Sequence, residues 1–175
     1  NATLQSVNID GHPLPIKQLE GEEPAESIDL SGNNLAVGSG VIIASLIGFN
    51  SVTKSLNLAF NELGPQGAEY VSEGLKENNT LTSLNVSGNT LGPDGAKAFA
   101  EMLKINTTLQ NVDVSDNYFY AEGAKAFADM LKINATLQSV NIDGHPLPIK
   151  QLEGELERQH PHQPWLGHVG HHPDC

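Results

Sequence analysis

A spacing of 28 residues, repeated along most of the chain, is the feature that most restricts its fold. Aliphatic residues recur at this interval in two parallel sets, Ile28, Leu56, Leu84, Val112 and Val140, and, two positions later, Leu30, Leu58, Val86, Val114 and Ile142. This alternation predicts short strands with one buried face. Because such a short strand cannot bury its face alone, the units are expected to stack side by side around one continuous core.

Each predicted strand is followed by a helical pattern, which is clearest over residues 92–106. One face of that helix would carry residues at i, i+3, i+4 and i+7, namely Ala96, Phe99, Ala100 and Leu103. Lys97 and Glu101, four residues apart, are expected to pair on the opposite face. An asparagine follows the strand in four units, at Asn33, Asn61, Asn89 and Asn117. Each unit is therefore predicted to consist of a strand, a turn and an amphipathic helix.

These units spell L-x-L-x-x-N-x-L four times and resemble leucine-rich repeats of the ribonuclease-inhibitor type, the 28-residue class also found in sensing regions of NOD-like receptors. The resemblance covers roughly residues 3–155. It implies an α/β leucine-rich-repeat solenoid, a horseshoe with a parallel concave sheet and convex helices. It also implies that the four asparagines form a structural ladder, whose amides satisfy backbone groups of neighbouring coils. The receptor analogy concerns the fold alone, since the sequence contains no nucleotide-binding segment.

The stretch NATLQSVNIDGHPLPIKQLEGE occupies residues 1–22 and returns unchanged at residues 134–155. In the first copy, the step from Val7 to Ile28 is 21 residues instead of 28, so part of the convex side is missing. The prolines between Pro13 and Pro24 leave room for one helical turn, near residues 16–19. One short irregular coil is thus predicted at each end. An unchanged copy beside diverged units is interpreted as a duplicated block within a longer repeat array.

The repeat pattern ends after Glu155, which divides the chain into a solenoid, residues 1–155, and a His- and Pro-rich tail, residues 156–175, expected to be disordered. The tail carries His160, His162, His168, His171, His172 and Cys175. Imidazoles and a thiolate can bind zinc or copper. Their spacing matches no closed site, so no metal site and no cofactor are assigned. A metal-responsive tail is kept as a less favoured alternative.

The charge of the chain restricts its partners. With 9 Lys+Arg against 21 Asp+Glu, the net charge is -12, which disfavours nucleic acid and anionic membranes and favours a basic protein surface. The most apolar stretch, residues 36–49, is too short to cross a bilayer. The single cysteine excludes an intrachain disulfide and suggests the cytoplasm. No phosphate-binding loop or convergent catalytic group is found in the sequence, so an enzyme is not expected.

The helix predicted near residues 38–49 lacks the charged outer face of the later units. Val41, Ser45 and Gly48 stand where the unit at residues 92–106 has Lys97, Glu101 and Lys104. Two explanations remain open. The neighbouring short coil could cover part of this helix, or the apolar helix near Val41 could serve self-association.

Five Asn-x-Ser/Thr triplets begin at Asn1, Asn78, Asn85, Asn106 and Asn134. Four of them, Asn1, Asn78, Asn106 and Asn134, occupy the same repeat position or its equivalent in the short coil, so the repeat explains them without glycosylation.

The outward strand positions carry small polar and acidic side chains, and large side chains occur only near the strand ends. Because the residues that contribute most binding energy at interfaces are enriched in Trp, Tyr and Arg, the predicted contact surface combines the concave row with the large aromatic residues of the turns. It comprises Asp29, Asn57, Phe60, Asn85, Asp113, Asp116, Tyr118, Tyr120 and Asn141. The chain is predicted to be a protein–protein interaction or scaffolding module. A purely structural spacer that recognises nothing is the alternative.

Overall fold

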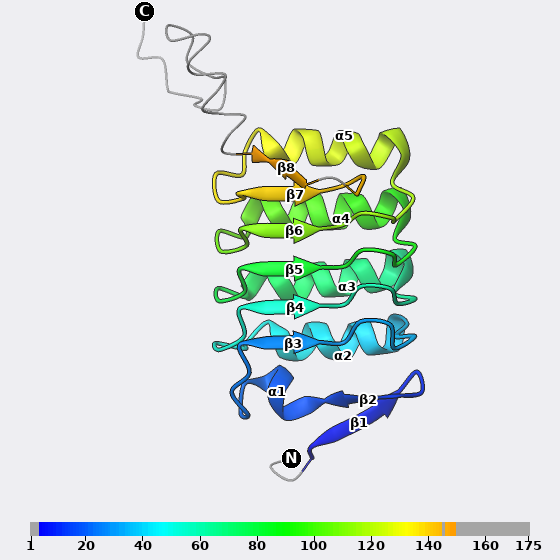
Figure 1. Ribbon diagram of the computed structural model, residues 1–175, viewed down its shortest axis with the longest axis vertical. Helices are drawn as coiled ribbons and strands as arrows, with labels where there is room; N and C mark the ends of the chain where they lie inside the picture. Colours follow the sequence, from blue (N-terminus) through cyan, green and yellow to red (C-terminus); the bar gives the residue numbers. More distant parts are fainter. Residues whose placement is uncertain (1–3, 145, 150–175) are drawn as a thin grey trace, which may run out of the picture.

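The computed structural model describes residues 4–144 and 146–149, so the predicted boundary at residue 155 and the His-rich tail lie outside the described residues. Two sheets are present, a hairpin of β1 and β2 and a six-stranded sheet in the order β3-β4-β5-β6-β7-β8 (Figure 1). The strands are β1 (Ser6–Ile9), β2 (His12–Pro15), β3 (Ser27–Asp29), β4 (Ser55–Asn57), β5 (Ser83–Asn85), β6 (Asn111–Asp113), β7 (Ser139–Asn141) and β8 (Pro146–Pro148). The helices are α1 (Ile16–Glu20), α2 (Val37–Ile47), α3 (Gly64–Glu77), α4 (Gly92–Ile105) and α5 (Tyr120–Leu131).

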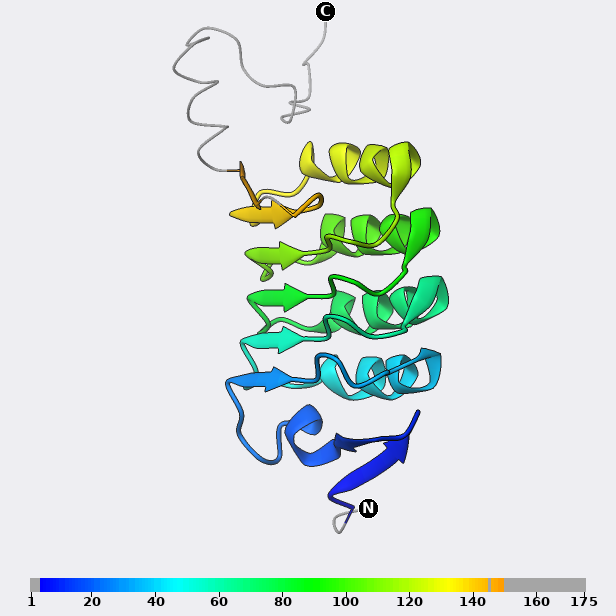
Figure 2. The same ribbon diagram turned by 45° about the vertical axis from the view of Figure 1, so that its right-hand side comes forward.

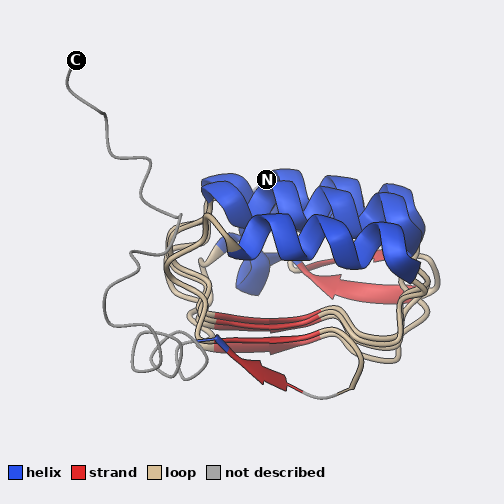
Figure 3. Ribbon diagram, turned by 90° about the horizontal axis from the view of Figure 1, so that it is seen from above, coloured by secondary structure: helices blue, strands red, loops and turns tan. Residues whose placement is uncertain are grey.

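Strands β3 to β7 are parallel, and each residue lies opposite the residue 28 positions later, as Ile28 does with Leu56. Helices α2 to α5 stack in the same order and form a second layer (Figures 2 and 3). The strand side chains predicted to face the core are buried, with Ile142 only partly so. The predicted α/β solenoid is therefore confirmed. The sheet face turned away from the helices is called the concave face below.

Helix α4 illustrates why the repeats form these helices. Gly92 and Pro93 begin the helix, and proline is well suited to its first turn because that position needs no amide donor. The predicted inner face is buried, and Phe99 is fully enclosed. Burial of one such side chain contributes about 1.5–3 kcal/mol. Most of the stability of each helix therefore comes from its packing on the sheet and on the helices beside it.

The predicted asparagine ladder is formed by Asn61, Asn89 and Asn117, which are 5%, 0% and 3% exposed. Oδ1 of Asn61 accepts hydrogen bonds from the amides of Asn33 and Leu35 at 2.9 and 3.0 Å. Its Nδ2 donates to the carbonyl of Leu30 in the preceding coil, at 2.9 Å. Each ladder asparagine thus joins two coils.

The prediction that the Asn33 side chain is part of this ladder is wrong. Asn33 is only half-buried, and within the described ranges its side chain makes no hydrogen bond. Its backbone amide instead donates to the Asn61 side chain. The reason is that the coil before it is the short one, which has no equivalent turn for the Asn33 side chain to reach.

A second asparagine ladder, which was not predicted from the sequence, joins the loops that follow the helices. Nδ2 of Asn78 donates to the carbonyls of Ile47 and Asn50 at 2.6 and 3.1 Å, and its Oδ1 accepts from the amide of Leu81 at 2.7 Å. Asn106 and Asn134 repeat this pattern. These three residues begin Asn-x-Thr triplets, and each is at most 8% exposed. Their amides are therefore structural.

Both copies of the doubled segment fold as β-hairpins with the same register. Val7 lies opposite Leu14 in the first copy, and Val140 lies opposite Leu147 in the second. The first turn has Asp10 at φ 55° and Gly11 at φ 81°, which is characteristic of a tight two-residue hairpin turn. The predicted helical turn is confirmed as α1. The short coil, however, is a hairpin whose strand β1 stays outside the parallel sheet.

The prolines of β2 explain why the sheet is interrupted. Pro13 and Pro15 are two residues apart, so their backbone nitrogens lie on the same edge of the strand, and neither can donate a hydrogen bond. Strand β1 pairs with the other edge. Strand β3 therefore finds no donors on the nearest edge of β2, and a new sheet begins with it.

Candidate protein-binding surface

The concave face carries one polar side chain from the last residue of each parallel strand: Asp29, Asn57, Asn85, Asp113 and Asn141. Oδ1 of Asp29 accepts hydrogen bonds from the Ser31 amide at 3.0 Å and the Ser31 hydroxyl at 2.7 Å. These two hydrogen bonds lower the pKa of Asp29 below its usual value, and the bond from the amide has the larger effect. The next three side chains bond in the same way to the amide two residues later. Each also has hydrogen-bonding capacity left for a partner.

Asn141 differs from the others in this row. Its Nδ2 donates to Oδ2 of Asp113 at 2.8 Å, while its Oδ1 is buried without a hydrogen-bond partner among the described residues. The counterparts of Asn141 each accept a hydrogen bond from the backbone amide two residues later. Asn141 does not form this bond among the described residues, because β7 leads into a hairpin instead of a repeat loop.

Three aromatic side chains are exposed after β4 and β6: two lie on the loops that follow these strands, and the third is the first residue of α5. Phe60, Tyr118 and Tyr120 are 66%, 62% and 72% exposed. All three have a positive φ, of 55°, 55° and 52°. A bulky residue in this left-handed region costs about 1–2 kcal/mol. The equivalent positions of other repeats include Gly32 and Gly88 for Phe60, Asn34 for Tyr118, and Gly64 and Gly92 for Tyr120.

The structure brings only some of the predicted contact residues together. Asp116, Tyr118 and Tyr120 line one groove of about 510 Å³, which Ile142 and Asp143 of the second hairpin also line. Phe60 lies elsewhere, with its ring against the next coil, where a Cβ on Gly88 would come within 2.7 Å of the ring. The residues of the concave row are not among those lining the groove. The predicted surface therefore has three parts: a groove near the C-terminal end of the solenoid, a polar row along the sheet, and Phe60 apart from the groove.

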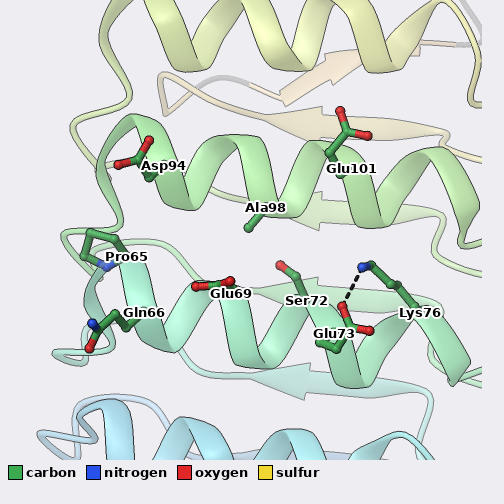
Figure 4. Close-up of a pocket in the computed structure, with 9 residues that line it drawn as sticks. All are labelled: Pro65, Gln66, Glu69, Ser72, Glu73, Lys76, Asp94, Ala98 and Glu101. Atoms are coloured by element: carbon green, nitrogen blue, oxygen red, sulfur yellow. Dashed lines mark hydrogen bonds and ion pairs between the residues drawn. The ribbon is translucent and has the colours of Figure 1, made fainter.

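A second groove, of about 500 Å³, lies on the convex side between α3 and α4 (Figure 4). Its charged residues are the carboxylates Glu69, Glu73, Asp94 and Glu101 and the ammonium of Lys76. Lys76 forms an ion pair with Glu73. This groove was not predicted from the sequence because its two helices contribute residues from separate repeats, and only stacking places them side by side.

Helix α2 carries the apolar outer positions seen in the sequence. Helix α1 packs against α2, and Ile42 and Leu46 are partly buried against the core. Val41 is 37% exposed and Phe49, just after the helix, is 84% exposed. The short coil thus packs against α2 and leaves these two side chains open. Self-association through Val41 remains a prediction.

No helix within the described ranges is long and apolar enough to cross a bilayer. No group of three or more His, Cys, Asp or Glu side chains within residues 4–144 and 146–149 is placed to hold a metal ion, and the histidines of the tail lie outside these ranges.

Comparison with known proteins supports the fold. A family model described as Leucine Rich repeat matches residues 54–72, 77–100 and 106–128. No curated protein matches the sequence. The solved structure of Leiomodin-1 Actin-Binding Site 2 has a TM-score of 0.70 at 22% identity, covering 85% of this chain and 96% of that one.

A tropomodulin C-terminal domain from Caenorhabditis elegans has a TM-score of 0.67 at 13% identity, with 83% and 91% of the two chains covered. Similarity at these identities shows the fold alone. Together with the three matched segments and the observed stacking, it confirms the resemblance seen in the L-x-L-x-x-N-x-L pattern. The chain is built of leucine-rich repeats and folds as a leucine-rich-repeat solenoid.

Proposed function

We propose that this chain is a protein–protein interaction and scaffolding module that contacts its partner through the turn aromatics and the concave row. One observation carries the proposal. Phe60, Tyr118 and Tyr120 are exposed and held at positive φ, where the positive-φ counterparts in other repeats are the smaller residues glycine, asparagine, aspartate and threonine. Strain and exposed apolar area are both unfavourable in the free protein. Binding of a partner would explain both the strain and the exposure, because burial of aromatic side chains by a partner stabilises the complex.

The partner we propose is a protein with a basic surface. Its support is the net charge of -12 together with the exposed carboxylates of Asp116 and Asp143 beside the aromatic groove. Such a charge steers a basic partner toward the surface and repels nucleic acid and anionic membranes.

We also propose that the repeats are of the ribonuclease-inhibitor type, that the protein is located in the cytoplasm, and that its role is not catalytic. One structural neighbour is an actin-binding site of leiomodin-1, so purified actin is the first protein to test.

The test compares binding by the wild-type chain and a triple variant, Phe60→Gly, Tyr118→Asn and Tyr120→Gly. These replacements copy Gly88, Asn34 and Gly92 from the same repeat positions, so they suit the left-handed backbone. Purified actin and proteins captured from a cell extract are measured against both chains. We expect the triple variant to bind at least about tenfold more weakly, since loss of an aromatic anchor typically costs more than about 1 kcal/mol.

The matched control is Tyr70→Ala, which removes an aromatic side chain that is 46% exposed on α3. Its binding is expected to equal that of the wild type. If the triple variant keeps the affinities and the partner list of the wild type, the contact surface is wrong. If the wild-type chain captures no protein above background, the structural-spacer alternative is favoured instead.

A further inference from the structure

The two copies of the doubled segment have the same hairpin fold, but a different strand of each hairpin lies against the solenoid. Leu4 in the first copy is 42% exposed, whereas its counterpart Leu137 is 2% exposed. Leu14 is fully buried, whereas its counterpart Leu147 is 42% exposed. The first hairpin therefore covers the coil that follows it and leaves the outer edge of β1 without a strand partner among the described residues. The second hairpin covers the coil that precedes it, at the opposite end of the solenoid (Figure 1).

Strand β7 shows what the outer edge of β1 is able to bind. The amides of Gln138 and Ser139 donate to the carbonyl of Gln110 at 2.7 and 3.1 Å, and the carbonyl of Asn141 accepts from the amide of Val114 at 2.9 Å. Within the described ranges, the counterparts Gln5, Ser6 and Asn8 make no such bonds to a parallel strand. The first hairpin thus carries an unused copy of the edge that binds β6.

We propose that two copies of this chain associate head to tail by exchanging these segments. The N-terminal hairpin of one chain takes the place of the C-terminal hairpin on β6 of the other. Ser6, Val7 and Asn8 would then lie opposite Asn111, Val112 and Asp113, in the register that β7 now has. Because the two segments are identical over 22 residues, β1 of the incoming hairpin is able to remake the pairing that β7 makes with β6.

The first hairpin is also bonded to the coil that follows it in its own chain. Oδ2 of Asp10 accepts hydrogen bonds from the amides of Ala36 and Ser39 at 3.0 and 2.9 Å, which anchors the first hairpin to α2. Asn50 adds bonds from its Nδ2 to the carbonyls that end α1. Among the described residues, the counterpart of Asp10 in the second hairpin, Asp143, makes no side-chain hydrogen bond. The bonds of Asp10 and Asn50 can persist when the first hairpin binds another chain, whereas the second hairpin occupies β6 and has to leave it to open that site.

Simple addition of a strand to the open edge of β8 is a less favourable route. Pro146 and Pro148 remove amide donors from that edge, in the same way that Pro13 and Pro15 do in β2. Exchange avoids this obstacle because the new pairing forms on β6. Each chain has one donor hairpin and one acceptor strand at opposite ends, so the association is heterologous and produces open chains of molecules.

The experiment traps the exchanged pairing with a disulfide in the full chain. Cys175 is replaced by serine, and Asn8→Cys is combined with Asp113→Cys. Adjacent strands place such opposed residues within the distance that a disulfide spans. After brief destabilisation and oxidation, we expect disulfide-linked dimers and longer ladders on a non-reducing gel, increasing with protein concentration. Mass measurement in solution should show the same series before oxidation.

Two controls make the outcome decisive. Asp113→Cys with Asn141→Cys should form the internal disulfide of the unexchanged chain, which shows that position 113 reacts. Asn8→Cys with Asn85→Cys should give about tenfold less linked dimer, because Asn85 already lies between Asn57 and Asp113 on the neighbouring strands. Equal linking of the 8/113 and 8/85 pairs would overturn the proposal. So would the absence of any 8/113 product under conditions in which the 113/141 disulfide forms.

Discussion

Asp10 caps helix α2 from outside that helix. Helix α2 has no capping side chain of its own, and Oδ2 of Asp10 receives the Ser39 hydroxyl at 2.7 Å as well as two helix-end amides. The hydrogen bond from the Ser39 hydroxyl, followed by those from the amides, lowers the pKa of Asp10 below its usual value. A single carboxylate in the hairpin turn thus joins the short coil to the first full repeat.

Asp10→Ala is expected to lower the free energy of unfolding by about 0.5–1 kcal/mol at neutral pH. This loss is at the lower end of the range usual for capping residues because Asp10 is exposed to solvent, which weakens its hydrogen bonds. The folded-state pKa is depressed, so this stability is present above the unfolded-state pKa of about 3.9 and is lost as the pH falls through the folded-state pKa. Denaturant unfolding at neutral and acid pH measures both effects. Asp143→Ala, the same residue in the second hairpin turn, should leave the stability unchanged, and equal losses in the two variants would refute the capping role.

Phe60→Gly and Tyr120→Gly should each raise the free energy of unfolding by about 0.5–1 kcal/mol, because relief of the left-handed strain exceeds the entropy that glycine adds to the unfolded chain. Thermal unfolding measures this. Gly88→Ala should have the opposite effect, since Gly88 has a φ of 64° and its new Cβ would meet the Phe60 ring. A loss of stability in Phe60→Gly would mean that the ring serves packing more than recognition.

Pairs of stacked coils are held together by polar ladders as well as by the apolar core. Nδ2 of Asn89 donates to the carbonyls of Leu58 and Val86 at 2.8 and 3.0 Å, and its Oδ1 accepts from the Leu63 amide at 3.3 Å. Asn89→Ala should therefore lower the free energy of unfolding by about 2–4 kcal/mol, because several buried backbone groups lose their partner. Asn33→Ala, at the same repeat position, should cost less than about 0.5 kcal/mol. Denaturant unfolding of the two variants checks the contrast, and similar losses would contradict the observed start of the ladder at Asn61.

Helices α2 and α3 approach closely at Gly74. A Cβ at this position would lie 2.8 Å from the backbone Cα and carbonyl carbon of Ala44, so backbone would have to move to admit it. Gly74→Ala is expected to lower the free energy of unfolding by about 1–3 kcal/mol, although alanine is the better helix former. Ser72→Ala, two residues earlier, removes a buried hydroxyl without a hydrogen-bond partner among the described residues and should leave the stability unchanged or raised. Calorimetry of both variants tests this, and a stabilised Gly74→Ala would show that the helices have room to separate.

The whole molecule presents a strong negative charge to any partner. If the proposed partner surface is basic, its association rate should fall by about tenfold or more between low and physiological ionic strength, because salt screens the long-range attraction. Stopped-flow association at several salt concentrations measures this dependence. The dissociation rate should change far less. An association rate that stays constant or increases with salt would exclude electrostatic attraction to a basic surface.

The repeat units, their buried faces and their parallel stacking could be predicted, because a 28-residue pattern is local and recurs. The hairpins could have been predicted from Asp10-Gly11, a typical two-residue turn signal, but the same segment also fits the pattern of a repeat strand. Other features depend on neighbouring coils. Lys97, expected to pair with Glu101, lies instead 3.3 Å from Asp94 and 2.8 Å from Glu122 of the next helix. The second asparagine ladder likewise becomes visible only when the loops are stacked.

The sequence by itself determined that this chain stacks strand-turn-helix units into a solenoid, because each unit has one apolar face and too little area to bury it alone. Only the tertiary structure decided what identical residues do at different places. Leu14 is buried where Leu147 is exposed, and Asp10 caps a helix where Asp143 makes no side-chain hydrogen bond among the described residues. The physical reason is that burial and hydrogen bonding depend on which coil lies next to a residue, and the two ends of a stack have their neighbours on opposite sides.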